Sequence, residues 1–73
     1  MKELLNILNE IRPDIDFKTE NKLITNGILD SLDLIALIDE LSDYYGINIK
    51  PYQLSAENFD SSDAILKLIN KLR

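Results

Sequence analysis

Asn26-Gly27-Ile28-Leu29-Asp30-Ser31-Leu32-Asp33 is the stretch that decides how this chain of 73 residues folds. Gly27 permits a backbone turn that residues with a Cβ atom resist, so the stretch opens with a turn. The residues after the turn predict a helix that begins at Asp30 or Ser31 and runs to about Tyr45. Gly46 is its expected C-terminal cap. The sequence therefore places a serine at a helix N-terminus, directly before the most acidic part of the protein.

The segment before this stretch predicts one helix and a long loop. Apolar residues recur with helical spacing over residues 2–12, at Leu4, Ile7, Leu8 and Ile11. Pro13 ends the helix, because the residue before a proline is pushed out of the helical region. Residues 13–29 have no sustained period, but their apolar residues indicate a loop pinned across the core: Ile15, Phe17, Leu23, Ile28 and Leu29. Such long loops in compact domains tend to be functional.

The segment after Gly46 predicts a short helical turn and one further helix. Ser55 is the expected cap of a turn that ends at Phe59, and either Asp60 or Ser61 caps the last helix. The buried stripe of that helix consists of Ile65, Leu68, Ile69 and Leu72. We therefore expect an all-α fold with a single domain over residues 1–73. Three to four helices would form a small bundle around a Leu/Ile core, with the long loop between the first two.

The central helix has two distinct faces on a helical wheel. Its core stripe is predicted to contain Leu34, Leu37, Ile38, Leu41, Tyr44 and Tyr45. The opposite face combines apolar and acidic residues: Leu32, Ile35, Ala36, Asp39, Glu40 and Asp43. A purely solvated face would have little use for Leu32 and Ile35, which favours a docking surface. Scattered exposed apolar residues are common, however, so the solvated interpretation stays open.

The charge distribution restricts the classes of partner. The chain has 13 acidic and 8 basic residues, a net charge of −5, and no basic residue between Lys22 and Lys50. An acidic face argues against nucleic acid and anionic membranes and favours partners with basic patches. No signal peptide or membrane-spanning run is recognised, so we expect a cytoplasmic protein without membrane insertion.

The residue types also argue against an enzyme and against a metal site. Cysteine and histidine are absent, which removes disulfides, thiolate and imidazole ligands, and a His base or Cys nucleophile. Asp14-Ile15-Asp16 opens like a calcium loop, but Lys18 and Thr25 stand where oxygen ligands are required. We therefore expect neither self-contained catalysis nor a bound metal.

Ser31 has two interpretations. Either Asp30 or Ser31 could cap the central helix, and a cap is the commoner role for such a residue. Alternatively, Ser31 is the attachment point of a covalent arm, because a helix N-terminus accommodates a phosphodiester electrostatically. Asp30 and Asp33 would repel such a phosphate, so we interpret them as contacts for a basic or metal-bearing partner enzyme.

Several segments resemble the acyl carrier protein family in order and spacing. They are residues 27–33, the central helix that follows, the Gly46-Ile47-Asn48-Ile49 segment after it, and Glu57-Asn58-Phe59-Asp60-Ser61. The resemblance covers nearly the whole chain. It implies that Ser31 receives 4'-phosphopantetheine from coenzyme A through a phosphopantetheinyl transferase that uses a divalent metal. The thiol of the arm would then carry acyl groups as thioesters, which suits a chain without cysteine.

The resemblance also implies which surface the partner enzymes read. The matching positions are Asp30, Leu32, Asp33, Ile35, Ala36, Asp39 and Glu40, and the wheel adds Asp43. The implied partners are acyl- or aminoacyl-loading and transfer enzymes with basic docking patches, acting on a monomeric carrier.

Two alternatives remain open at this stage. Leu29-Asp30-Ser31 resembles acyl carriers or the D-alanyl carrier type more than peptidyl carriers. The lead-in Gly27-Ile28-Leu29 departs from fatty-acid-synthesis carriers, which favours a specialised, stand-alone carrier of an acyl or aminoacyl group. The rival hypothesis is an unmodified helical module that uses the same acidic-apolar face to hold a basic partner.

Overall fold

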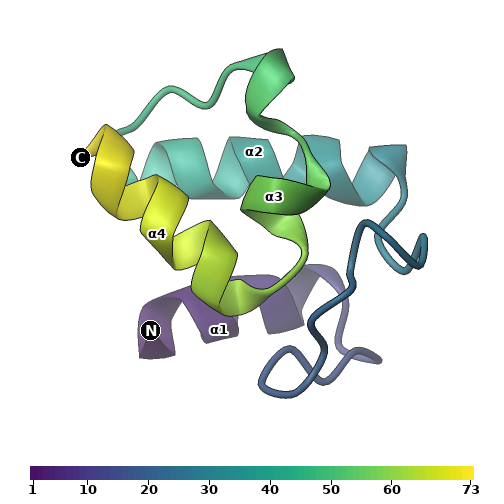
Figure 1. The fold of residues 1–73 in the computed structure, drawn as a ribbon. Coiled ribbons are helices and arrows are strands. Elements are labelled where there is room, and N and C mark those ends of the chain that lie inside the picture. The colour runs from purple at the N-terminus through teal and green to yellow at the C-terminus, as the bar shows by residue number, and fades with distance from the viewer.

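The computed structural model describes all 73 residues, and helices are its only regular secondary structure (Figure 1). Its elements are α1 (Lys2–Ile11), α2 (Ser31–Tyr45), the 3₁₀ helix η1 (Pro51–Gln53), α3 (Ala56–Phe59) and α4 (Ser62–Leu72). The predicted all-α bundle, with a long loop between its first two helices, is confirmed. No helix combines the length and the apolar character that crossing a membrane would require.

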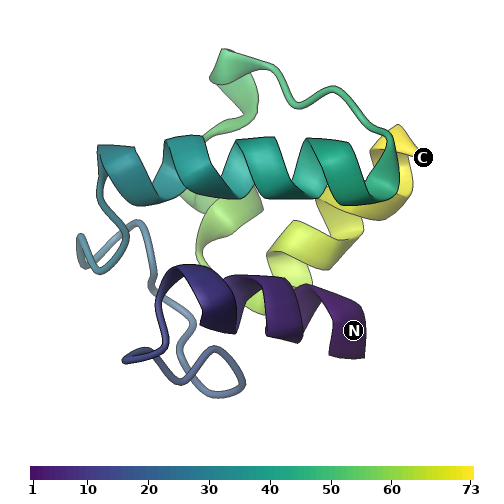
Figure 2. The ribbon, with the colours of Figure 1, turned by 180° about the vertical axis from the view of Figure 1, so that it is seen from behind.

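The helices are arranged so that the start of α2 and the two chain ends lie at opposite ends of the molecule. Helix α1 packs against α2 and α4, and α3 packs against α4. The long loop passes the N-terminal end of α2, whereas both termini lie beside its C-terminal end (Figures 1 and 2). The loop end of the bundle therefore contains the turn that leads into Ser31.

One buried core holds these elements together, and the loop contributes to it as well as the helices. Its fourteen residues are Leu4, Ile7, Leu8, Phe17, Leu23, Leu29, Leu37, Leu41, Ile47, Ile49, Phe59, Ile65, Leu68 and Ile69. The predicted stripes of α1 and α4 are confirmed, with Ile11 and Leu72 partly buried at their ends. Helix α1 ends one residue before the predicted end, because Arg12 adopts non-helical backbone angles ahead of Pro13.

The core stripe predicted for α2 is correct except at Tyr44. Leu37 and Leu41 are buried, and Leu34, Ile38 and Tyr45 are partly buried against the core. Tyr44, however, is 59% exposed. Its ring lies edge-on to Tyr45 in a surface hollow lined also by Met1 and Arg73. No helix of the bundle packs over the Tyr44 ring on this side.

Asp60 fastens the long loop to the junction between α3 and α4. Its carboxylate accepts hydrogen bonds from the backbone N–H groups of Ile24 and Thr25, both at 2.8 Å, and from the Thr25 hydroxyl at 2.6 Å. Its carbonyl accepts the N–H of Leu23 at 2.9 Å. The bonds from Thr25 hold the pKa of Asp60 below its ordinary value. The predicted pinning of the loop is thus confirmed, and polar contacts contribute to it.

The capping residues of the last two helices are also settled. Ser61 caps α4, where its hydroxyl accepts the N–H of Ala64 at 3.1 Å, and this leaves Asp60 available to the loop. Ser55 occupies the N-cap position of α3 as predicted, but its side chain makes no capping bond. The neighbouring Ser62 is buried and donates its hydroxyl to the Phe17 carbonyl at 3.0 Å, a second tie between loop and bundle.

We expect Asp60→Asn to lower the thermal unfolding midpoint at neutral pH, because an amide cannot accept all of these bonds. A carboxyl group whose pKa is lower in the folded chain stabilises fully above its unfolded pKa and loses this contribution as the pH falls through the folded value. The difference between wild type and variant should therefore persist at neutral pH and shrink below about pH 3.8, the ordinary value. Circular dichroism melts across this range measure it. Asp39→Asn is the control, since Asp39 is exposed; an equal loss there would contradict the assignment.

Candidate functional site

The N-terminus of α2 is capped by Asp30, which settles the choice that the sequence left open. Asp30 Oδ1 accepts the N–H of Asp33 at 2.9 Å, and Asp33 Oδ2 accepts the N–H of Asp30 at 3.1 Å. This reciprocal pair is a capping box, with Asp in place of the usual Glu at its third position. Ser31 is consequently the first residue of the helix and not its cap.

The hydroxyl of Ser31 is therefore free of any structural task. The residue is exposed, and its side chain makes no hydrogen bond. The backbone N–H groups of Ser31 and Leu32 precede the first intrahelical donor, which is the N–H of Leu34 bonded to the Asp30 carbonyl at 3.0 Å. Unpaired donors and the positive end of the helix dipole thus lie beside an accessible hydroxyl.

The turn that presents Ser31 is anchored to the core. The carbonyl of Leu23 accepts the N–H groups of Ile28 and Leu29 at 2.9 and 3.0 Å. Leu29, two residues before the serine, is buried in the core. Gly27 has φ +66°, the left-handed conformation that the sequence predicted for this position. The serine is thus held on a fixed turn even though it follows a long loop.

Arg12 joins the end of α1 to this turn, a contact that the sequence analysis missed. Its Nη1 donates to Asp33 Oδ2 at 2.5 Å and to the Ile28 carbonyl at 3.1 Å. Its Nε and Nη2 donate to the two carboxylate oxygens of Asp14 at 2.9 and 2.8 Å. Asp14 and then Asp33 raise the pKa of the guanidinium, which in turn lowers the pKa of Asp14. No motif or periodicity could have indicated a pair 21 residues apart.

The outer face of α2 is as exposed as the wheel predicted. Leu32 and Ile35 are 76% and 63% exposed, and the other exposed members of the face are Ala36, Asp39, Glu40 and Asp43. Asp30 is also exposed at the head of the helix. The Asp33 side chain differs, since it is only 13% exposed and is occupied by Arg12 and the capping box. The face beside Ser31 is therefore apolar near the serine and acidic further along.

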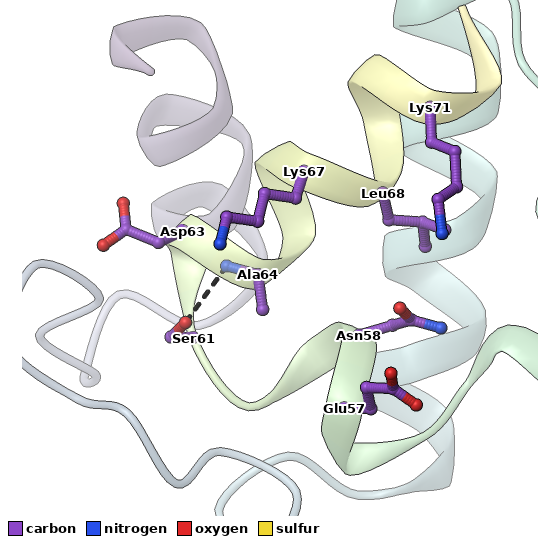
Figure 3. A pocket seen from close by; sticks show the side chains of 8 residues that line it. All are labelled: Glu57, Asn58, Ser61, Asp63, Ala64, Lys67, Leu68 and Lys71. Carbon is purple, nitrogen blue, oxygen red and sulfur yellow. Dashed lines mark hydrogen bonds between the residues drawn. The ribbon is translucent and has the colours of Figure 1, made fainter.

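A separate surface hollow lies between α3 and α4 and does not include Ser31 (Figure 3). Its lining includes Lys67 and Lys71 of α4 and Glu57 of α3; the Lys67 side chain runs toward the start of α4, and that of Lys71 runs toward Asn58. The hydrogen bond drawn between its lining residues is the capping bond of α4. No set of three acidic side chains is placed to hold a metal ion. The exposed, unbonded hydroxyl of Ser31 is thus the candidate site that the geometry favours.

Comparison with known proteins indicates the class of protein that this sequence resembles. No family model matches the chain. The sequence is similar to the D-alanyl carrier protein of Streptococcus mutans, with 26% identity over 72 residues that cover 97% of this chain and 91% of that protein. The predicted resemblance to the carrier proteins is confirmed. The relative is named as a carrier, in line with the expectation that this chain is not an enzyme.

We expect Asp30→Ala and Ser31→Ala to differ in stability although the residues are adjacent. Loss of the cap should lower the free energy of unfolding by about 1 kcal/mol, whereas loss of the free hydroxyl should change it by less than about 0.5 kcal/mol. Urea unfolding followed by circular dichroism measures both, and Asp30→Asn, which retains a capping side chain, should stay close to wild type. A Ser31→Ala loss as large as that of Asp30→Ala would show that the serine caps the helix.

Proposed function

We propose that residues 1–73 form a carrier domain that bears 4'-phosphopantetheine on Ser31 and presents a thioester-bound cargo to partner enzymes. The observation that supports this most directly is the free hydroxyl at the first position of α2, released from capping by Asp30. The similarity to a carrier protein along nearly the whole chain adds to it.

The residues around Ser31 fit a phosphodiester. The unpaired N–H groups of Ser31 and Leu32 offer donors to phosphate oxygens, and the helix dipole favours negative charge there. The carboxylate of Asp33 is already paired with Arg12, which reduces its repulsion of the phosphate. When bound, the arm would supply the thiol that a chain without cysteine lacks.

The chain contributes the nucleophile for attachment but not its activation. Ser31 Oγ would form a bond to the phosphorus next to the pantetheine arm of coenzyme A. The bond from that phosphorus to the bridging oxygen breaks, and the adenosine bisphosphate leaves with that oxygen. The nearby carboxylates of Asp30 and Asp33 are engaged in the capping box. The base that takes the serine proton, and the divalent metal, would therefore come from the transferase.

The outer face of α2 would be the docking surface for the transferase and for loading and transfer enzymes. Leu32, Ile35 and Ala36 offer an apolar centre, and Asp39, Glu40 and Asp43 offer an acidic rim for basic patches. Asp30 lies at the head of this surface. Asp33 would contribute little direct contact to a partner, since its carboxylate is paired with Arg12 and mostly buried.

We further propose that the cargo is an aminoacyl group of the D-alanyl kind, because the similar protein is named a D-alanyl carrier protein. Mass spectrometry of the protein from its native host, combined with release by hydroxylamine, would identify the cargo. Recovery of the alanine hydroxamate in its D form supports the proposal. Recovery of a long saturated acyl hydroxamate would contradict the aminoacyl cargo and indicate a general acyl carrier.

Attachment is tested by incubating the purified chain with coenzyme A, Mg²⁺ and a promiscuous phosphopantetheinyl transferase. Intact mass spectrometry should show one added phosphopantetheine group on the wild type and none on Ser31→Ala. Ser55→Ala is the control, because Ser55 is another serine at the start of a helix, in the N-cap position, and this variant should be modified as the wild type is. An unmodified wild type, or modification of Ser31→Ala, would contradict the proposal and favour the unmodified interaction module.

Docking is tested with the same reaction at low substrate concentration. Asp39→Lys and Leu32→Asp should each lower kcat/KM by about tenfold, which is about 1.4 kcal/mol of recognition energy. The Asp39→Lys loss should shrink at high salt, because salt screens exposed charges. Asp63→Lys makes the same charge change on the outer side of α4 and should leave kcat/KM unchanged. Equal losses at Asp63 and Asp39 would indicate a general charge effect in place of a docking face.

A further inference from the structure

One nitrogen of Arg12 contacts residues on both sides of Ser31 in the sequence. Nη1 donates to the Ile28 carbonyl, three residues before Ser31, and to the Asp33 carboxylate, two residues after it. The same Asp33 oxygen accepts the N–H of Asp30. The guanidinium of Arg12 therefore links the loop before Ser31, the N-cap of α2 and the first helical turn of α2.

The guanidinium is held more firmly than that of an ordinary surface ion pair. Its opposite edge makes two parallel hydrogen bonds to Asp14, and its side chain is 28% exposed. A planar guanidinium with hydrogen bonds along both edges has little rotational freedom. A lysine ammonium could not make the same set of bonds in this fixed geometry. The position of Asp33, and through it the cap, is consequently set by a residue at the end of α1.

The contact also changes the charge beside the reacting hydroxyl. Attachment at Ser31 would bring a phosphodiester next to Asp30 and Asp33, and both carboxylates oppose it electrostatically. The positive charge of Arg12 lies against Asp33 and offsets this repulsion. It would do so during transfer as well as in the modified protein.

We propose that Arg12 is a positioning residue for the modification of Ser31, an inference that rests on the function proposed above. It holds the turn and the cap so that Ser31 Oγ can reach the phosphorus of coenzyme A, and it neutralises Asp33 next to the incoming phosphate. The bonds formed and broken are those given above, and Arg12 takes no proton in the step.

The test compares phosphopantetheine transfer to wild type and variants, with the transferase, coenzyme A and Mg²⁺. Arg12→Gln should lower kcat by about tenfold with little change in KM, because the docking face on α2 is untouched. Arg12→Lys should recover part of this loss by restoring the charge without the fork. Asp14→Asn keeps one acceptor for the guanidinium and leaves the contacts with Ile28 and Asp33 in place, so it should lower kcat less than Arg12→Gln does.

A second set of variants separates positioning from stability. Ile69→Val lies in the core on α4, and its cost of about 1 kcal/mol provides a destabilised control with an intact site. All reactions run well below the unfolding midpoint of each variant. If Arg12 acts through Asp33, adding Asp33→Asn to Arg12→Gln should cost less than the sum of the two single losses.

The outcomes distinguish this inference from the proposed function. A wild type that is never modified overturns both. A modified wild type with Arg12→Gln within about twofold of it, or with a loss no greater than that of Ile69→Val, overturns the role of Arg12 and leaves the carrier function standing. A selective fall in kcat with partial rescue by lysine supports it.

Discussion

The reciprocal hydrogen bonds between Asp30 and Asp33 are the interaction on which the rest of this structure depends. They satisfy two backbone donors at the start of α2 and fix where that helix begins. Because Asp30 performs the capping, the next residue is relieved of it, and Ser31 can present an unbonded hydroxyl. A serine in the cap position would have had its oxygen committed to the backbone. The division of labour between two adjacent polar residues thus creates the candidate site.

The long loop that leads to this site is held by contacts with the rest of the fold, although it has no regular structure of its own. Asp60 and Ser62 hold it from the α3–α4 side, Arg12 holds its start and end from α1, and Leu29 anchors its last turn in the core. Apart from the local contact between Arg12 and Asp14, these hydrogen bonds join residues between 16 and 45 positions apart. These side chains support the turn ahead of Ser31 from within the fold, and none of them belongs to the exposed face of α2.

Local patterns predicted the three longer helices well, since each has a buried apolar stripe, and α2 and α4 also have a recognisable capping side chain. The exposed face of α2 followed from the same geometry. Local patterns failed where the answer depended on distant parts of the chain. Tyr44 fits the core stripe on a wheel, but the bundle ends beside it. The choice between Asp30 and Ser31 as cap, and the contacts of Arg12 and Asp60, depend on residues brought together only by folding.

Both chain termini lie at the far end of α2 from Ser31 (Figures 1 and 2). An affinity matrix, a fluorescent protein or a sensor chip linked to either terminus would therefore hold the molecule with its serine directed outward. The roughly 22 Å that a 15-residue helix spans separates the two ends. Immobilised protein should accordingly remain open to large visiting enzymes, which makes surface-based kinetics of their arrival and departure practical for a chain this small.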